Sequence, residues 1–296
     1  MSDVNIFDRV AVRRNRERSA AGFKGHDFLY REVAGRLVDR LADIMRTFSL
    51  ALDIGGRDGL LARALAEAGE DKVGTVITAD LSETYARSAS APALVADEEW
   101  LPFKDGCFDL VTSCLALHWV NDLPGALIQM NRALKPDGLL LAAMLGGETL
   151  SELKECLIAA ELELRGGVSP RTSPVAGVSD AGMLLQRAGF ALPVVDSDVI
   201  TVTYPDALAL MRDLRGMGES NAVNSRPRGL TPPAVLMKAA ADYAQRHAGP
   251  DGRIVASFEI ITMTGWTPAE GQPRPLRPGS AKTRLADALG AKETKL

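Results

Sequence analysis

The feature that most constrains this chain is a glycine-rich turn that directly follows a short apolar run. The stretch reads Leu50-Ala51-Leu52-Asp53-Ile54-Gly55-Gly56-Arg57-Asp58-Gly59-Leu60-Leu61-Ala62-Arg63. It predicts a first strand, a tight turn and a first helix. Glycine lets the backbone approach a ligand closely, and the start of a helix offers N–H groups without partners. The turn is therefore expected either to border a binding site or to be a plain buried connection.

Two phosphate-binding motifs are excluded by the spacing within this turn. Gly55 and Gly59 stand in a G-x-x-x-G frame with Arg57 between them, which is not the G-x-G-x-x-G of a dinucleotide site. The chain also lacks G-x-x-x-x-G-K-[ST], so a phosphate-cradling loop of that type is not expected.

Composition places the chain among ordinary globular proteins. It has 296 residues with 46% hydrophobic and 24% charged side chains, enough for one large domain or a domain with a cap. The formal net charge of −4 argues against a nucleic-acid binder. No apolar run is long enough to span a membrane, and the polar N-terminus does not resemble a signal peptide. A cytoplasmic protein, at most peripherally attached to a membrane, is expected.

Cysteine and histidine usage points away from disulfides and metal sites. The three cysteines form no C-x-x-C pair, and the three histidines are far apart in the sequence. These residues are Cys107, Cys114, Cys156, His26, His118 and His247. We therefore expect a reducing compartment and no metal ligands.

Beyond the turn, strand-like and helical patterns alternate, which predicts a parallel sheet with right-handed crossovers. The expected strands after the first are 73–79, 93–96, 108–114 and 139–144, with a turn signal at 135–138. A long amphipathic helix over 27–48 precedes the first strand. Two alternating segments, 194–204 and 254–264, predict the last two strands.

This organisation predicts three parts. Residues 1–48 form an N-terminal helical segment, and residues 49–266 form the main domain. Within that domain we expect a helical cap at about 148–190 and an insert at about 205–252 between the last two strands. Residues 267–296 are Pro-rich and basic and are expected to be an exposed tail.

The N-terminal segment carries five arginines, which predict either a solvated helix face or a basic face that meets an acidic partner. They are Arg9, Arg13, Arg14, Arg16 and Arg18.

Acidic residues follow the second and third expected strands. Asp80 would point into the crevice at the carboxyl ends of the strands, where it could accept hydrogen bonds from ribose hydroxyls, or it could cap the next helix. The acids after the third strand, Asp97 and Glu98, could accept from an adenine amino group, and Trp100 or Leu101 could cover its ring.

Taken in order, these motifs resemble the class I S-adenosylmethionine (SAM) methyltransferases. The matching stretches are Asp53-x-Gly55 with Gly59, Asp80, Asp97 with Leu101-Pro102-Phe103, Phe108-Asp109-Leu110-Val111 and Leu134-Lys135-Pro136-Asp137-Gly138. The resemblance implies a Rossmann-like α/β fold with a seven-stranded, mostly parallel sheet. It implies SAM as the cofactor, bound by Asp53, Gly55, Gly59, Asp80, Leu81, Asp97 and Glu98. Arg57 departs from the motif's middle glycine, and its side chain either crowds the methionine end of SAM or turns outward.

Further stretches resemble two related families. Leu117-His118-Trp119-Val120-Asn121-Asp122-Leu123-Pro124 and Gly147-Glu148-Thr149-Leu150-x-Glu152-Leu153 resemble both the malonyl-carrier-protein O-methyltransferases and the respiratory complex I assembly factor 5 proteins. Phe7-Asp8-Arg9, Arg215-x-Met217-Gly218-Glu219-x-Asn221-Ala222 and Pro275-Leu276-Arg277-Pro278-Gly279-Ser280-Ala281 favour the assembly-factor branch in its bacterial form. That branch implies hydroxylation of an arginine on the iron–sulfur subunit of complex I near the quinone site.

Three residues are candidates for chemistry. His118 follows the fourth expected strand and would act as a general base or orienting donor, or else be a packed histidine beside Trp119. Glu219 and Asn221 could grip a guanidinium, or could cap their loop. Four nearby arginines could hold an acidic acyl substrate or form a solvated rim; they are Arg212, Arg215, Arg226 and Arg228.

Three functions remain open from the sequence. The first is a SAM-binding enzyme that hydroxylates or methylates an arginine of a complex I subunit. The second is an O-methyltransferase for a small acid or a malonyl-carrier protein, and the third is a non-catalytic assembly factor with a degenerate SAM site. Hydroxylation normally needs an activated metal or flavin, and the sequence shows no two-histidine, one-carboxylate pattern.

Overall fold

The computed structural model describes residues 5–69, 71–90, 92–174 and 177–273, together with residues 280, 283 and 290. Most of the expected tail at 267–296, including 274–279 and 281–282, lies outside these residues. The division of the chain into three parts stays a prediction.

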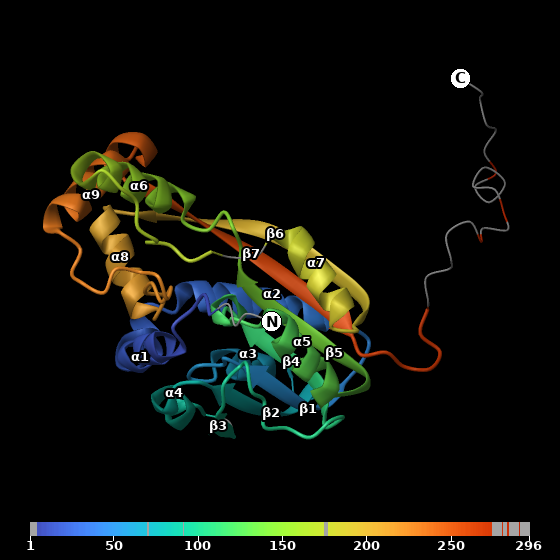
Figure 1. Ribbon diagram of the computed structural model, residues 1–296. Helices are drawn as coiled ribbons and strands as arrows, with labels where there is room; N and C mark the ends of the chain where they lie inside the picture. The colour runs from blue at the N-terminus through green and yellow to red at the C-terminus, as the bar shows by residue number, and fades with distance from the viewer. Residues whose placement is uncertain are drawn as a thin grey trace.

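In the described residues seven strands form one sheet in the order β3-β2-β1-β4-β5-β7-β6 (Figure 1). The strands β1 to β5 run parallel to one another, whereas β7 runs antiparallel to both β5 and β6. Their bounds are β1 Phe48–Ile54, β2 Val73–Asp80, β3 Ala93–Val95, β4 Phe108–Cys114, β5 Leu134–Leu145, β6 Ala191–Tyr204 and β7 Ile254–Trp266. The predicted mostly parallel α/β sheet is confirmed.

Helices cover both faces of this sheet. The helices are α1 Arg9–Ser19, η1 Ala20–Gly25, α2 Phe28–Ala42, α3 Leu60–Glu67, α4 Glu83–Ser88, η2 Leu117–Trp119, α5 Leu123–Ala133, α6 Ser151–Arg165, α7 Val178–Arg187, α8 Ala207–Gly216 and α9 Pro233–His247. Residues from α2, α3, α6, α8 and α9 share one apolar core, and residues from α5 and α7 share the other. Successive residues of β5 alternate between the two cores, as the period of a strand buried on both faces requires.

The last two strands are long and support the remaining helices. In Figure 1, β6 and β7 run side by side past the end of β5, and α6, α8 and α9 lie around their far end. Along the sequence, α8 and α9 belong to the segment that connects β6 to β7. The helix α1 packs against α4 and α8, so the first helix of the chain and this connecting segment lie together.

Two local expectations differ from the structure. The expected helix over 27–48 ends at Ala42, and the next strand begins at Phe48. The expected turn at 135–138 lies inside β5, where the pairing with β4 changes register and Asp137 has a positive φ of 61°. The turn signal thus marks a bulge that bends a strand. Among the described residues, no helix is both long and apolar enough to cross a membrane.

Candidate cofactor cleft and guanidinium chamber

The glycine turn lies at the carboxyl end of β1, between that strand and α3. Gly55 has a φ of +67°, and a Cβ placed on it would lie 2.2 Å from the Cβ of Ala116. Gly59 has a φ of +77° directly before α3, in the left-handed region that favours glycine. The turn therefore needs glycine at both positions, as the motif predicts.

Asp53 lies under this turn and is fully buried. Burial raises its pKa to about 7, the nearby Asp80 acts in the same direction, and a hydrogen bond of 3.2 Å from Thr112 acts against it. Its Oδ2 atom has no hydrogen-bond partner among the described residues. Asp53 therefore keeps one acceptor available behind the turn.

Asp80 ends β2, where the sequence predicts the ribose acid. Its Oδ1 accepts a hydrogen bond from the Ser82 amide at 2.7 Å, and its Oδ2 accepts one from the Arg57 amide at 3.1 Å. The guanidinium of Arg16 lies 3.5 Å from Oδ2. Leu81, the adjacent predicted position, packs against a small apolar cluster that includes Phe7 and Trp119.

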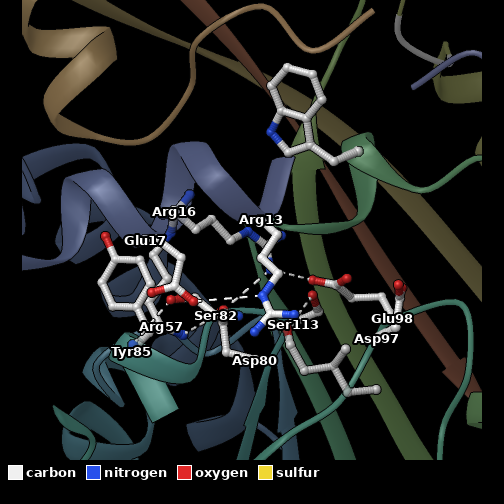
Figure 2. A network of polar contacts seen from close by, with 12 residues as sticks. Arg13, Arg16, Glu17, Arg57, Asp80, Ser82, Tyr85, Asp97, Glu98 and Ser113 are labelled. Atoms are coloured by element: carbon white, nitrogen blue, oxygen red, sulfur yellow. Dashed lines mark hydrogen bonds and ion pairs between the residues drawn. The ribbon is translucent and has the colours of Figure 1, made fainter. Parts of the chain in front are cut away.

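The predicted adenine acids also meet arginines of α1. Arg16 donates to Glu98 at 2.5 Å (Figure 2). Arg9 donates to Asp97 at 2.5 Å and also pairs with Glu98. Burial acts to raise the pKa of Glu98, but the charges of Arg16 and Arg9 outweigh it and hold that pKa at about 2. Trp100 is 79% exposed and does not cover a ring site.

The predicted solvated face of the N-terminal arginines is wrong for two of the five. Only 1% of the Arg16 side chain and 16% of the Arg9 side chain are exposed. Burial acts to lower the pKa of Arg16, but Glu98 and Asp80 outweigh it and raise that pKa above its usual value. Arg13, Arg14 and Arg18 lie on the exposed side of α1. The helix thus directs part of its charge into the cleft.

Arg57, the departure from the methyltransferase motif, turns inward. Its guanidinium carbon lies 4.4 Å from the ring centre of Tyr30, 5.2 Å from Phe23 and 5.5 Å from Tyr85. Its Nη2 donates to Glu219 Oε1 at 2.7 Å and also to the Tyr30 hydroxyl. Three aromatic rings and a carboxylate therefore surround a guanidinium, and we call this enclosure the guanidinium chamber.

Glu219 anchors the chamber from the segment that follows α8. Besides Arg57, it accepts hydrogen bonds from Tyr30 at 2.6 Å, Trp119 at 2.7 Å and His118 at 3.0 Å. Burial acts to raise the pKa of Glu219, but the charges of His118 and Arg57 and the hydrogen bonds outweigh it and hold that pKa at about 2. The structure therefore brings together two predicted chemical residues, His118 and Glu219.

The third predicted residue, Asn221, is not in the chamber. Its side-chain Nδ2 donates to the Pro170 carbonyl at 2.8 Å, and its side-chain Oδ1 accepts from the backbone amide of Val223 at 2.9 Å. Asn221 therefore caps its loop, which is the alternative that the sequence left open for it. Arg226 and Arg228 both pair with Asp8, which fits a rim and not an acid-binding pocket.

Sequence reasoning missed the aromatic and N-terminal members of the site. Tyr30 lies within the expected helix over 27–48 and carries no signal of its own, and Trp119 stands out only as the neighbour of His118. The available signal was the density of arginines before Ser19, which fits a solvated helix face and a basic face that meets an acid equally well.

The cavity that the glycine turn lines is too small for SAM. The cavity at the turn has a volume of about 10 Å³, roughly the space of one water molecule, and is lined by Phe23, Tyr30, Gly55, Gly56, Arg57, Leu60, Leu61 and Cys114. Asp53, the turn and Asp80 are arranged as a nucleoside site requires, but Arg16 and Arg57 occupy the carboxylates around it. The side chains at this site have the chemistry that a nucleoside needs, but in this conformation arginines of the chain itself occupy the carboxylates.

Comparisons with known proteins support the methyltransferase resemblance. A family model for a methyltransferase domain matches residues 52–142. "Arginine-hydroxylase NDUFAF5, mitochondrial" of Danio rerio is 43% identical over 96% of this chain and 89% of its own length. The Homo sapiens protein of the same name is 44% identical over 96% of this chain and 83% of its length. "Malonyl-[acyl-carrier protein] O-methyltransferase" of Halorhodospira halophila is 35% identical, covering 89% and 90%. The predicted resemblance to both families is confirmed.

Solved structures show the same fold. The YcgJ protein of Bacillus subtilis has a TM-score of 0.56 at 18% identity, covering 80% of this chain and 99% of its own. Phosphoethanolamine N-methyltransferase 2 of Haemonchus contortus, solved in complex with SAM, has a TM-score of 0.54 at 17% identity, covering 87% and 60%. These likenesses confirm the fold of the chain.

The prediction of a cytoplasmic protein is wrong by these comparisons. The four NDUFAF5 relatives at 42–44% identity are named mitochondrial proteins. Sequence reasoning rested on the missing signal peptide and membrane span, and neither feature identifies the compartment.

Proposed function

Because the chain belongs to the family of arginine-hydroxylase NDUFAF5 proteins, on the methyltransferase fold, we propose that it modifies an arginine side chain of a respiratory complex I subunit. The modification we favour is hydroxylation, the reaction in the relatives' name. The proposed substrate is an arginine of the iron–sulfur subunit near the quinone site, which supports assembly of the complex.

The observation that supports an arginine substrate is the guanidinium chamber itself. Glu219 accepts a hydrogen bond from the Arg57 guanidinium at 2.7 Å, and Tyr30 stacks on that guanidinium at 4.4 Å. A planar cation with several donors suits a carboxylate flanked by aromatic faces better than an ammonium does. The chamber therefore has the chemistry to receive an arginine side chain from another protein.

Entry of a substrate arginine requires an exchange. Glu219 already accepts four hydrogen bonds, so a second guanidinium takes the place of Arg57 on Oε1. His118 and Trp119 hold Oε2 and keep the carboxylate oriented during this exchange. In this proposal Glu219 binds the substrate, and His118 positions Glu219.

In this proposal, co-substrates supply the oxygen atom and the electrons for hydroxylation. Hydroxylation of carbon requires an oxygen donor and a reductant. Across the described residues, no three His, Cys, Asp or Glu side chains gather as metal ligands would. The proposal therefore assigns binding and orientation of the arginine to this chain.

The test is mass spectrometry of complex I subunits from cells that lack the chain. Reintroducing the wild-type chain should restore one modified arginine on the iron–sulfur subunit near the quinone site. Glu219→Gln should not restore it, whereas the exposed-surface variant Arg14→Ala should. A gain of one oxygen atom identifies hydroxylation, and a gain of one methylene unit identifies methylation.

Two other outcomes would assign the alternatives. Restored assembly with no modified subunit, by wild type and Glu219→Gln alike, would indicate a non-catalytic assembly factor. Methyl transfer from SAM to a malonyl-carrier protein would indicate the O-methyltransferase, whose relatives are 31–35% identical. The pairing of Arg226 and Arg228 with Asp8 leaves those two arginines poorly placed for an acidic acyl group.

A further inference from the structure

We propose that α1 is a built-in plug of the cofactor cleft, and that SAM binds only after Arg16 has left Asp80 and Glu98. The inference rests on the use of SAM at this site and adds a regulation to it. Arg16 acts as an internal competitor, because it occupies the carboxylate that would receive the ribose hydroxyls and the one beside it (Figure 2).

The docked Arg16 is paired in charge but poorly satisfied in hydrogen bonds. Its Nη1 reaches Glu98 at 2.5 Å and Asp80 at 3.5 Å. Its Nε and Nη2 atoms are buried and have no hydrogen-bond partner among the described residues. Unsatisfied buried donors carry a desolvation cost, so the docked side chain of Arg16 is held by charge and not by a complete set of hydrogen bonds.

Withdrawal of α1 would remove both Arg16 and Arg9 and leave Asp80 and Glu98 as two buried carboxylates without a paired cation. The ribose hydroxyls of SAM can donate to Asp80, and its adenine amino group can donate to Glu98. Replacing Arg16 by SAM therefore returns hydrogen-bond donors to the same two acids. Arg16 and SAM therefore compete for the same two carboxylates, those of Asp80 and Glu98.

The two ends of α1 are attached in different ways. At its C-terminal side the helix continues into η1, whose Gly22 and Gly25 have no neighbouring atom within 4 Å of an added Cβ. At its N-terminal side the chain joins the segment after α8 through the Asp8 amide and the Ala222 carbonyl, at 2.8 Å. Arg13, Arg14 and Arg18 face outward and add no contact with the cleft acids.

Competition of this kind sets the measured affinity. The apparent dissociation constant is the intrinsic one divided by the fraction of molecules in which α1 is undocked. A change that weakens docking without touching the cofactor therefore tightens SAM binding, which is the reverse of what removal of a binding residue does.

The first test is calorimetric titration of SAM into wild type, Arg16→Ala and the matched control Arg14→Ala. We expect Arg16→Ala to bind SAM at least about fivefold more tightly than wild type, and Arg14→Ala to match wild type. Equal or weaker binding by Arg16→Ala would overturn the plug, because Arg16 would then be neutral or a cofactor ligand.

The second test uses a single variant in which a disulfide can fix α1 in its docked position or release it. Phe7 and Val223 form an antiparallel bridge flanked by hydrogen bonds from Asp8 to Ala222 and from Asn224 to Ile6. This pattern marks a pair whose Cα atoms lie about 4.5 Å apart, within the span of a disulfide. The double variant Phe7→Cys, Val223→Cys should bind SAM more weakly when oxidised than when reduced, with Val223→Cys alone as the control.

Equal SAM binding by the oxidised and reduced forms would overturn the plug. Absence of SAM binding by every variant, reduced or oxidised, would overturn it as well. Tighter binding by Arg16→Ala together with no modified arginine in cells would support the plug while the proposed function fails, so the two proposals are separable.

Discussion

At the scale of single residues, burial decides which charges matter in this protein. Glu219 has only 6% of its side chain exposed and Arg57 only 3%, and both lie in an aromatic enclosure. Removing one member of such a pair leaves the other as a buried, uncompensated charge. The chamber is thus costly to disturb, whatever reaction it supports.

Glu219→Gln tests this cost and its dependence on pH. The pKa of Glu219 is about 2 in the folded protein, below its ordinary value of 4.5. Its ionised form therefore stabilises the fold above pH 4.5, and this contribution is lost as the pH falls toward 2. Glu219→Gln should lower the free energy of unfolding at pH 7 by about 3–5 kcal/mol and flatten its fall between pH 4.5 and 2.

Urea unfolding across this pH range measures both effects. An exposed carboxylate, Glu32, supplies the control. In Glu32→Gln the free energy of unfolding should fall between pH 4.5 and 2 as steeply as it does in wild type. An unchanged slope in Glu219→Gln would show that its ionisation does not support the fold.

The two glycines of the turn should differ in their tolerance of alanine. At Gly55 an added Cβ meets Ala116 at 2.2 Å as well as a positive φ, whereas at Gly59 the nearest atom lies at 3.6 Å and only the φ is unfavourable. We expect Gly59→Ala to cost about 1–2 kcal/mol and Gly55→Ala clearly more, with loss of SAM binding. Thermal unfolding and SAM titration of both variants check this order, and equal costs would contradict it.

Local backbone chemistry explains why the turn could be predicted and the chamber could not. Asp53, Gly55, Gly59 and Asp80 carry signals in adjacent residues, because a strand end, a positive φ and a helix start are local events. The contact between Arg16 and Glu98 joins residues 82 positions apart, and that between Tyr30 and Glu219 joins residues 189 apart. No local pattern encodes such pairs, so a solvated face was the reasonable expectation for the arginines of α1.

At the scale of elements, α2 is tied to the outer strand β6 by exposed ion pairs. Arg36 reaches Asp198 and Arg40 reaches Asp196, each at 2.5 Å. The four side chains are each about 40% to two-thirds exposed, so solvent and salt screen these pairs. Besides joining two elements, the charges on β6 make this sheet edge a poor partner for another strand.

The exposure of these pairs predicts a small energetic effect. The double variant Arg36→Ala, Arg40→Ala should lower the free energy of unfolding by no more than about 1–2 kcal/mol at low salt, and by less at high salt. Urea unfolding at two salt concentrations measures this. A loss as large as that expected for Glu219→Gln, and insensitive to salt, would contradict the screening argument.

At the scale of the whole molecule, the N-terminal segment and the chain after α8 form one wall over the cleft. Phe7 pairs with Val223, Asn15 donates to the Ser220 carbonyl at 2.8 Å, and Glu219 closes the chamber from the same segment. The residues between Met217 and Asn224 are therefore expected to loosen when α1 loosens. A cofactor plug and a substrate chamber would then open together, although more than 200 residues of sequence separate their parts.

Gly218 allows this coupling to be tested from the side opposite α1. It has a φ of +81°, and an added Cβ would lie 2.8 Å from the Ser19 hydroxyl and 3.2 Å from Arg57. Gly218→Ala should therefore strain the wall and raise amide hydrogen exchange both in α1 and in residues 217–224, while β4 and β5 remain protected. The control is Gly229→Ala, where an added Cβ meets no atom within 4 Å and exchange should not change. If exchange in Gly218→Ala rose only around residue 218, α1 would be an independent element, and opening of the cleft would not by itself open the chamber.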